Sequence, residues 1–213
     1  MFKDPSFIYL ATILPPILLG LIIWKSDKFP EPGKFLVASF LLGVSIYLPL
    51  DLLIMITEDH IAPLIGLDFT TDPYTHAEHA FMMFFRAAFL EEGIKFAILL
   101  FFCVRLSALN EPMDAVVYGA AIGLGFAAME NIGYVNIDPE TAWTMTVVKQ
   151  RYYPLIMHLG FGVLLGWLLS LNLFEERSPF KRRIMLILAL AILPMLGVGG
   201  MHLYKAEATG PIK

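Results

Sequence analysis

Long apolar runs separated by short polar segments dominate this sequence. A helix that crosses the ~30 Å hydrocarbon core of a bilayer needs about 20 apolar residues, and six segments meet this requirement. Their predicted ranges are 7–24, 35–56, 79–104, 114–135, 152–173 and 184–203. The pattern therefore predicts an all-α, polytopic transmembrane helix bundle of about six spans. We expect one integral membrane domain over residues 1–213.

The connection between the second and third segments, residues 57–78, is the longest one. It is acidic and contains two prolines together with His60 and His76. A short helix at the membrane surface and a lid over the bundle would both suit such a segment. No tandem repeat is evident along the chain.

Composition agrees with a membrane protein. Charged residues make up 16% of the chain, whereas soluble domains average about 25%. The net charge of −4 and the lack of long basic runs argue against a nucleic-acid partner. The single cysteine, Cys103, excludes an internal disulfide framework. The first segment lacks a small-residue cleavage pattern, so we interpret it as a membrane span.

The distribution of basic residues predicts the orientation of the bundle. Cytoplasmic loops carry an excess of Lys and Arg. Eight basic residues fall on one side of the predicted spans: Lys25, Lys28, Lys34, Arg105, Arg177, Lys181, Arg182 and Arg183. Five fall on the other: Lys3, Lys149, Arg151, Lys205 and Lys213. The sequence therefore predicts a multi-pass protein of the cell membrane with both termini extracytoplasmic.

The third predicted span holds an unusual group of charges. Glu91 and Glu92 are adjacent, Lys95 follows one turn later, and Arg86 precedes them. Ionisable residues at this depth are costly and are a functional-site hypothesis by default. Glu91 and Lys95 are four residues apart, so we expect them to pair on one helix face while Glu92 points elsewhere. A purely structural Glu91–Lys95 pair is the alternative.

The fourth span ends in a second polar group, Glu130 and Asn131. A carboxylate near a helix end could serve a site or simply extend to water. The same span carries small residues at four-residue spacing, namely Ala115, Gly119 and Gly123. Such spacing lets helix backbones approach closely in lipid, so we expect these residues to mediate packing.

Histidines complete the set. His158 lies in the fifth span and His202 near the end of the sixth. With the predicted topology, these histidines, Glu130 and the paired glutamates all fall in the outer half of the bilayer. Glu and neutral His suit a divalent metal such as zinc, and they equally suit activation of water by a general base. Either chemistry needs a water-filled cavity, which the long loop and the glycines of span four could supply.

These motifs carry a family resemblance. Glu91-Glu92-x-x-Lys95, then Phe126-x-x-x-Glu130-Asn131, and then His158 together resemble the PrsW family of intramembrane proteases. That family is similar to the wider superfamily that includes the CAAX prenyl proteases and their bacterial CPBP relatives. The resemblance covers about residues 85–202, and the core motifs lie within 79–203.

The resemblance implies roles for the motif residues. One of Glu91 and Glu92 would activate water, while Glu130 and His158 would complete the catalytic group. Lys95, Asn131 and Arg151 would support it. A divalent metal, with zinc as the first candidate, would use these ligands: His158, His202, Glu130 and Glu91. In this sequence Gly162 stands where the superfamily has Asn or Asp, which removes one candidate oxyanion-stabilising amide.

The function that follows is an intramembrane endopeptidase. It would hydrolyse a peptide bond of a membrane-anchored protein near the extracytoplasmic face. The resemblance further implies regulated proteolysis, with a membrane-bound anti-sigma factor as one substrate of this kind. Two alternatives stay open. The Glu/His cluster could serve a proton-coupled transporter or an ion-conducting protein, and the small-residue stripe could bind partner helices in a non-catalytic scaffold.

Overall fold

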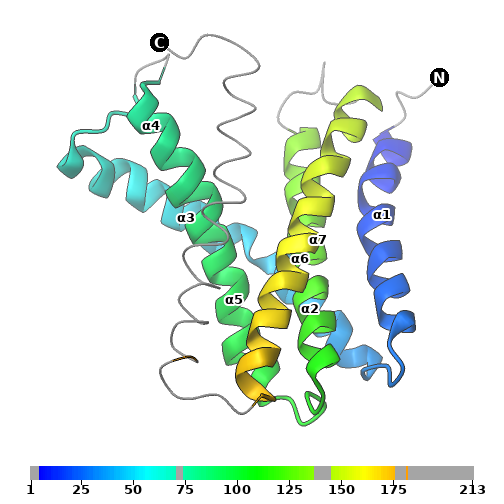
Figure 1. Ribbon diagram of the computed structural model, residues 1–213. Helices are drawn as coiled ribbons and strands as arrows, with labels where there is room; N and C mark the ends of the chain where they lie inside the picture. The colour runs from blue at the N-terminus through cyan, green and yellow to red at the C-terminus, as the bar shows by residue number, and fades with distance from the viewer. Residues whose placement is uncertain (1–4, 71–73, 137–144, 176–180, 182–213) are drawn as a thin grey trace.

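The computed structural model describes residues 5–70, 74–136, 145–175 and 181, which form helices and turns and no strand (Figure 1). The α-helices are α1 (Pro5–Ser26), α2 (Gly33–Ser45), α3 (Tyr47–Ile56), α4 (His76–Ala80), α5 (Glu91–Phe101), α6 (Pro112–Asn136) and α7 (Met145–Leu173). The tighter or wider helical segments are η1 (Thr57–Ile61), η2 (Ala62–Ile65), η3 (Phe81–Leu90) and η4 (Cys103–Arg105). The predicted all-α membrane fold is confirmed.

Four helical stretches in the described part of the chain are long and apolar enough to cross a membrane. They are Ser6–Ser26, Gly33–Ile65, Pro112–Tyr134 and Val148–Leu173, and they match the first, second, fourth and fifth predicted spans. The helical stretch that follows Thr75 is too rich in charge to join this group, because it carries Arg86, Glu91, Glu92 and Lys95. The sixth predicted span, 184–203, lies outside the described residues, so the count of six stays a prediction.

Helix α6 is the centre of the bundle, and α1, α2 and α7 pack around it (Figure 1). Glycines allow these close approaches. A Cβ added at Gly119 would overlap the backbone oxygen of Gly162 on α7, and one added at Gly123 would overlap that of His158. The predicted packing role of the small-residue stripe is confirmed, and α7 covers the surface that a scaffold would have offered to a partner.

The second predicted span is bent rather than straight. Helix α2 ends at Ser45, and the Ile46 N–H bonds back to Gly43 O at 3.3 Å, three residues earlier. Pro49 follows and has no N–H to donate to Ser45, which interrupts the helical ladder. Helix α3 therefore turns across the long axis of the other helices (Figure 1). This bend directs α3 away from α6 (Figure 1).

The third predicted span is also irregular. Its first turn, α4, begins at a capping box in which Thr75 Oγ1 accepts from Glu78 N and the Glu78 carboxylate accepts from Thr75 N. The next ten residues, Phe81–Leu90, form a π-helix, and regular α-helix resumes at Glu91. π-helical turns are wider than α-helical ones and are frequent at functional sites. The apolar pattern gave no sign of this change.

Candidate active site

Helix α5 buries one face, and this face decides which glutamate is paired. The buried positions are Glu92, Lys95, Phe96 and Leu99, which recur with the spacing of one helix face. Lys95 Nζ lies 2.7 Å from Glu92 Oε1, and both side chains are almost completely buried. The expected Glu91–Lys95 pair is therefore wrong. Lys95 and Glu92 both belong to the buried face and pair there, whereas Glu91 lies beside that face.

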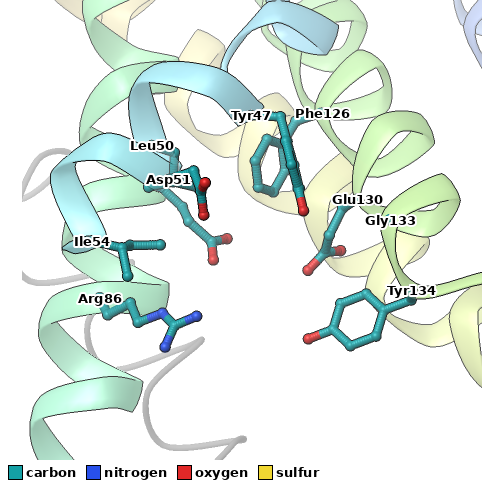
Figure 2. A pocket seen from close by; sticks show the side chains of 10 residues that line it. Tyr47, Leu50, Asp51, Ile54, Arg86, Phe126, Glu130, Gly133 and Tyr134 are labelled. Carbon is teal, nitrogen blue, oxygen red and sulfur yellow. The ribbon is translucent and has the colours of Figure 1, made fainter. Parts of the chain in front are cut away.

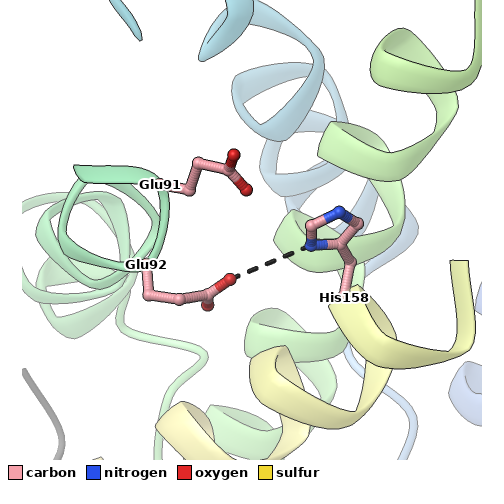
Figure 3. Close-up of side chains that lie close together, drawn as sticks. All are labelled: Glu91, Glu92 and His158. Atoms are coloured by element: carbon pink, nitrogen blue, oxygen red, sulfur yellow. Dashed lines mark ion pairs between the residues drawn. The ribbon is translucent and has the colours of Figure 1, made fainter. Parts of the chain in front are cut away.

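His158 on α7 approaches the same pair. Its Nδ1 lies 3.0 Å from Lys95 Nζ and 3.8 Å from Glu92 Oε1 (Figure 3). An ammonium group can only donate, so Nδ1 must accept and the ring proton must sit on Nε2. This assignment makes His158 a neutral imidazole in the observed arrangement.

The other nitrogen of His158 faces Glu130. Nε2 lies 3.2 Å from Glu130 Oε2, to which it donates. Arg151, two turns before His158 on α7, donates to the same Glu130 oxygen through Nη2 and to Asn131 Oδ1 through Nε at 2.9 Å. One guanidinium therefore fixes both polar residues at the end of α6, and its carbon lies 3.9 Å from the centre of the Tyr134 ring.

Phe126 is the apolar floor of this network. Lys95 Nζ lies 4.0 Å from the centre of its ring, a cation–π contact that offsets part of the cost of burying the ammonium. The His158 ring meets Phe126 edge-on, with 4.9 Å between ring centres. The Phe126-x-x-x-Glu130 spacing thus places the aromatic ring and the carboxylate on one face of α6, one turn apart.

A cavity of about 170 Å³ opens between α3, η3 and α6 (Figure 2). It is large enough for several water molecules. Its walls are Tyr47, Leu50, Asp51, Ile54, Arg86, Glu91, Phe126, Glu130, Gly133 and Tyr134. The expected sources of the cavity were different: the long loop contributes none of these residues, and the glycines of span four contribute only Gly133. The bend before α3 creates the space instead.

Glu91 and Glu130 face this cavity from opposite walls. Glu91 makes no hydrogen bond or ion pair with any residue in the described part of the chain, and it is only partly buried. Glu92, in contrast, is buried, and one of its carboxylate oxygens, Oε2, has no partner among the described residues. The two adjacent glutamates therefore occupy different environments: Glu91 lies at the cavity and Glu92 inside the protein.

Three of these side chains could hold a metal ion together. Glu91, Glu92 and His158 each offer a ligand atom, and these atoms all lie within 4.8 Å of one another (Figure 3). Compared with the predicted ligand set, this group includes Glu92 and does not include Glu130. The remaining predicted ligand, His202, lies outside the described residues.

The structure thus brings together these predicted site residues: Glu91, Glu92, Lys95, Glu130, Asn131, Arg151 and His158. Sequence reasoning missed Tyr47, Asp51 and Tyr134 on the cavity wall. Tyr134 lies one turn after Glu130 on the same face of α6, so the four-residue spacing could have identified it. Tyr47 and Asp51 depend on the bend before α3, which no spacing rule indicates. The sequence showed the charge of Arg86, but it did not indicate the ion pair that Arg86 forms with Glu58 at 2.8 Å.

Comparison with known proteins identifies the family of this chain. The sequence profile described as PrsW family intramembrane metalloprotease matches residues 31–198. Protease PrsW of Shouchella clausii (strain KSM-K16) is 28% identical over 194 residues, which cover 90% of this chain and 80% of that protein. Protease PrsW of Bacillus subtilis (strain 168) is 29% identical over 188 residues, covering 87% and 77% respectively.

A short segment has another relative. Over 28 residues the chain is 68% identical to the Trk system potassium uptake protein TrkH of Escherichia coli (strain K12), which is 13% of this chain and 6% of that protein. So small a share does not support a transporter. No solved structure matches the chain. With a profile match over most of its length and relatives aligned across nearly all of it, the chain belongs to the PrsW family of intramembrane metalloproteases and is an intramembrane peptidase.

Proposed function

We propose that this peptidase hydrolyses a peptide bond of a membrane-anchored protein in the cavity between α3, η3 and α6. The observation that carries the proposal is the different placement of the adjacent glutamates. Glu91 lines the cavity without a protein partner in the described residues, and Glu92 is buried against Lys95. A carboxylate at a wet cavity can take a proton from water, whereas one held by an ammonium is suited to positioning.

In this proposal Glu91 orients the attacking water and accepts its proton. The Glu130–His158 pair supplies the opposite proton transfer. His158 Nε2 donates its proton in a hydrogen bond to Glu130 Oε2, and Glu130 lines the same cavity as Glu91. This proton passes through Glu130 to the amine that leaves when the peptide bond breaks, while Nδ1 takes a proton from the Lys95 ammonium, 3.0 Å away, so that the imidazole stays neutral. Arg151 keeps Glu130 at this position.

A divalent metal fits these residues, and we propose Glu91, Glu92 and His158 as its ligands. The buried Glu92 Oε2 has no partner within the described segments, and the atoms Glu92 Oε1 and His158 Nδ1 already contact the positive charge of Lys95. Carboxylate and imidazole ligands favour zinc. When bound, such a metal lowers the pKa of its water to about 7 and polarises a carbonyl. His202 stays a proposed further ligand.

The substrate and the membrane face belong to the same proposal. The excess of basic residues on the loops after the first, third and fifth spans favours extracytoplasmic termini. The site lies toward the same end of the bundle as the start of α1, where Ile8 packs against Val148, one turn before Arg151. Cleavage would then occur near the extracytoplasmic face. A membrane-anchored regulator such as an anti-sigma factor suits a peptidase with this access, and its cleavage would be a form of regulated proteolysis.

The test is cleavage of a membrane-anchored reporter by the purified chain in liposomes. We expect Glu91→Gln, Glu92→Gln, Glu130→Gln and His158→Gln each to lower the cleavage rate at least a hundredfold, since general acid–base groups contribute about 10²–10⁴-fold. Asp59→Asn, an exposed carboxylate away from the cavity, is the matched control and should retain full activity. Full activity in all four site variants would contradict the proposal. Ion flux in the same liposomes, abolished by these variants, would favour the transporter alternative.

A further inference from the structure

A second group of carboxylates lies at the opposite end of the bundle. Asp27 follows α1, and Asp114 lies in the first turn of α6 with Glu111 just before that helix. Each of the three offers a carboxylate oxygen within 4.8 Å of those of the other two. Glu31 is beside them and is buried, and its Oε2 accepts from the Tyr118 hydroxyl. The peptidase mechanism uses none of these residues.

Two oxygens in this group lack the partners that buried oxygens normally have. Asp114 Oδ2 accepts from the backbone N–H of Asn110 and Glu111 at 2.7 and 2.8 Å, but Asp114 Oδ1 is buried with no partner among the described residues. Asp27 Oδ1 accepts from Phe29 N at 3.1 Å, but Asp27 Oδ2 is likewise buried with no partner in the part of the chain that the structure describes. Asp114 is completely buried and Asp27 is 7% exposed. An unpartnered buried carboxylate oxygen is costly, so each such oxygen requires an explanation.

No cation in the described part of the chain supplies that partner. Among the described residues, no Lys or Arg nitrogen lies within 4 Å of these four carboxylates. Burial raises the pKa of Glu31 to about 7. The negative charges of Asp114 and Asp27 raise it further, whereas the hydrogen bond from Tyr118 lowers it. The pKa of Glu111 is raised in the same direction by burial and by the same two aspartates. The charge of Lys28 offsets part of this effect at Glu111, but no described cation contacts the two unpartnered aspartate oxygens.

We propose that Asp27, Glu111 and Asp114, assisted by Glu31, bind a hard divalent cation at a second site distinct from the peptidase centre. All-oxygen carboxylate sites select Ca²⁺ or Mg²⁺ over softer metals. Oxygens bound to one Ca²⁺ are at most about 4.6–5.2 Å apart, given Ca–O distances of about 2.3–2.6 Å, and the ligand oxygens of this group, all within 4.8 Å of one another, are close enough to reach one ion. The cation would tie the connection between α1 and α2 to the beginning of α6.

A shared proton is the competing explanation. A protonated Glu31 could donate to Asp114 Oδ1, which would satisfy one of the two oxygens without a metal. It would leave Asp27 Oδ2 unexplained. Both oxygens are satisfied together by a cation, which is why the metal site accounts for more of the structure.

The experiment titrates the full chain in detergent with Ca²⁺ and with Mg²⁺ and measures Tm by thermal unfolding. A parallel titration uses Tb³⁺, a luminescent analogue of Ca²⁺, to measure binding. Trp24 is suited to sensitise Tb³⁺, since its indole N–H donates to the backbone oxygen of Glu31 at 2.6 Å. We expect saturable binding and a rise in Tm of a few degrees at about 100 times Kd. The same titration in a Glu91→Gln/His158→Gln chain should still show binding, which separates this site from the peptidase centre.

Asp27→Asn and Asp114→Asn keep the acceptor oxygens of the backbone hydrogen bonds and remove the charge, so each should fold and weaken binding at least tenfold. Asp68→Asn is the matched control. Asp68 accepts from Thr70 N, two residues later, as Asp27 does from Phe29 N, and it lies outside the group. Equal affinity in all three variants, or no saturable binding by the unaltered chain, would overturn the proposal. A Tm that does not change with Ca²⁺ or Mg²⁺, but changes with pH only when Glu31 is present, would overturn the proposal in favour of the shared proton.

Discussion

Lys95 pairs with Glu92 and not with Glu91: its Nζ lies 2.7 Å from Glu92 Oε1, and neither side chain is more than 1% exposed. Both glutamates are about one helical turn from Lys95, so spacing alone does not choose between them. The choice follows from which face of α5 packs against α6 and α7. It leaves Glu91 at the cavity, and the two carboxylates should therefore respond differently to substitution.

The first prediction separates the two glutamates by stability. Glu91→Gln should abolish cleavage but leave Tm nearly unchanged, because Glu91 makes no ion pair in the described residues. Glu92→Gln should also lower Tm, since loss of one partner of a buried pair costs about 3–5 kcal/mol. Thermal unfolding of both purified variants is the measurement.

A double variant provides the control for this reasoning. Glu92→Gln with Lys95→Met removes both charges, so it should regain much of the lost stability while staying inactive. Equal Tm values for Glu91→Gln and Glu92→Gln would show that the Glu92–Lys95 pair does not stabilise the fold.

The second prediction concerns Arg151, which donates to both Glu130 and Asn131. Arg151→Met should lower the cleavage rate about 10–100-fold, as expected for a residue that orients others. Arg151→Lys should rescue little, because an ammonium does not reproduce the fork of donors. Lys149→Met, an exposed neighbour on the same helix, is the control. A rate for Arg151→Met equal to that control would exclude the positioning role.

The third prediction concerns helix packing. Gly123→Ala places a Cβ against the backbone oxygen of His158, and overpacking of this kind costs about 1–3 kcal/mol or more. Because the displaced residue is His158 itself, cleavage should fall together with Tm. In Gly160→Ala the added Cβ meets no atom within 4 Å, so activity and Tm should be retained. Activity of Gly123→Ala at the level of Gly160→Ala would contradict the observed contact.

The fourth prediction concerns the metal of the peptidase. A chelator should abolish cleavage, and zinc should restore it. Elemental analysis of the unaltered chain should find about one zinc, as in a single catalytic site. Glu91→Gln and His158→Gln should lower this content, whereas Asp27→Asn should not. Full zinc content in His158→Gln would remove this residue from the ligand set.

The fifth prediction follows from Glu31, whose pKa is raised from 4.5 to about 7, mainly by burial. A group with a raised pKa in the folded state binds its proton more tightly there, so its stabilising effect is complete below about pH 4.5 and is lost as pH rises to about 7. In the presence of a chelator, Tm should therefore fall between these pH values. Glu31→Gln, which cannot titrate, should remove this component. An identical dependence of Tm on pH for the unaltered chain and for Glu31→Gln would show that the pKa of Glu31 is not raised in the folded protein.

The sequence by itself determined the membrane fold and most of the site. Apolar runs of about 20 residues have few alternatives to helices in lipid, because every backbone group must be satisfied within its own segment. Glu91, Glu92, Glu130 and His158 stood out for a related reason: ionisable residues at such depth are rare. Their motif spacing then supported the family, and the small residues of α6 indicated close packing.

Only the tertiary structure decided which of these groups meet. The partner of Lys95 depends on the face that α5 buries, and the cavity depends on how far the bend before α3 carries that helix from α6. The π-helical stretch before Glu91 and the cluster of Asp27, Glu111 and Asp114 also arise from segments brought together by packing. Local spacing fixes neighbours within one helix, whereas contacts between helices depend on crossing and rotation that no single segment encodes.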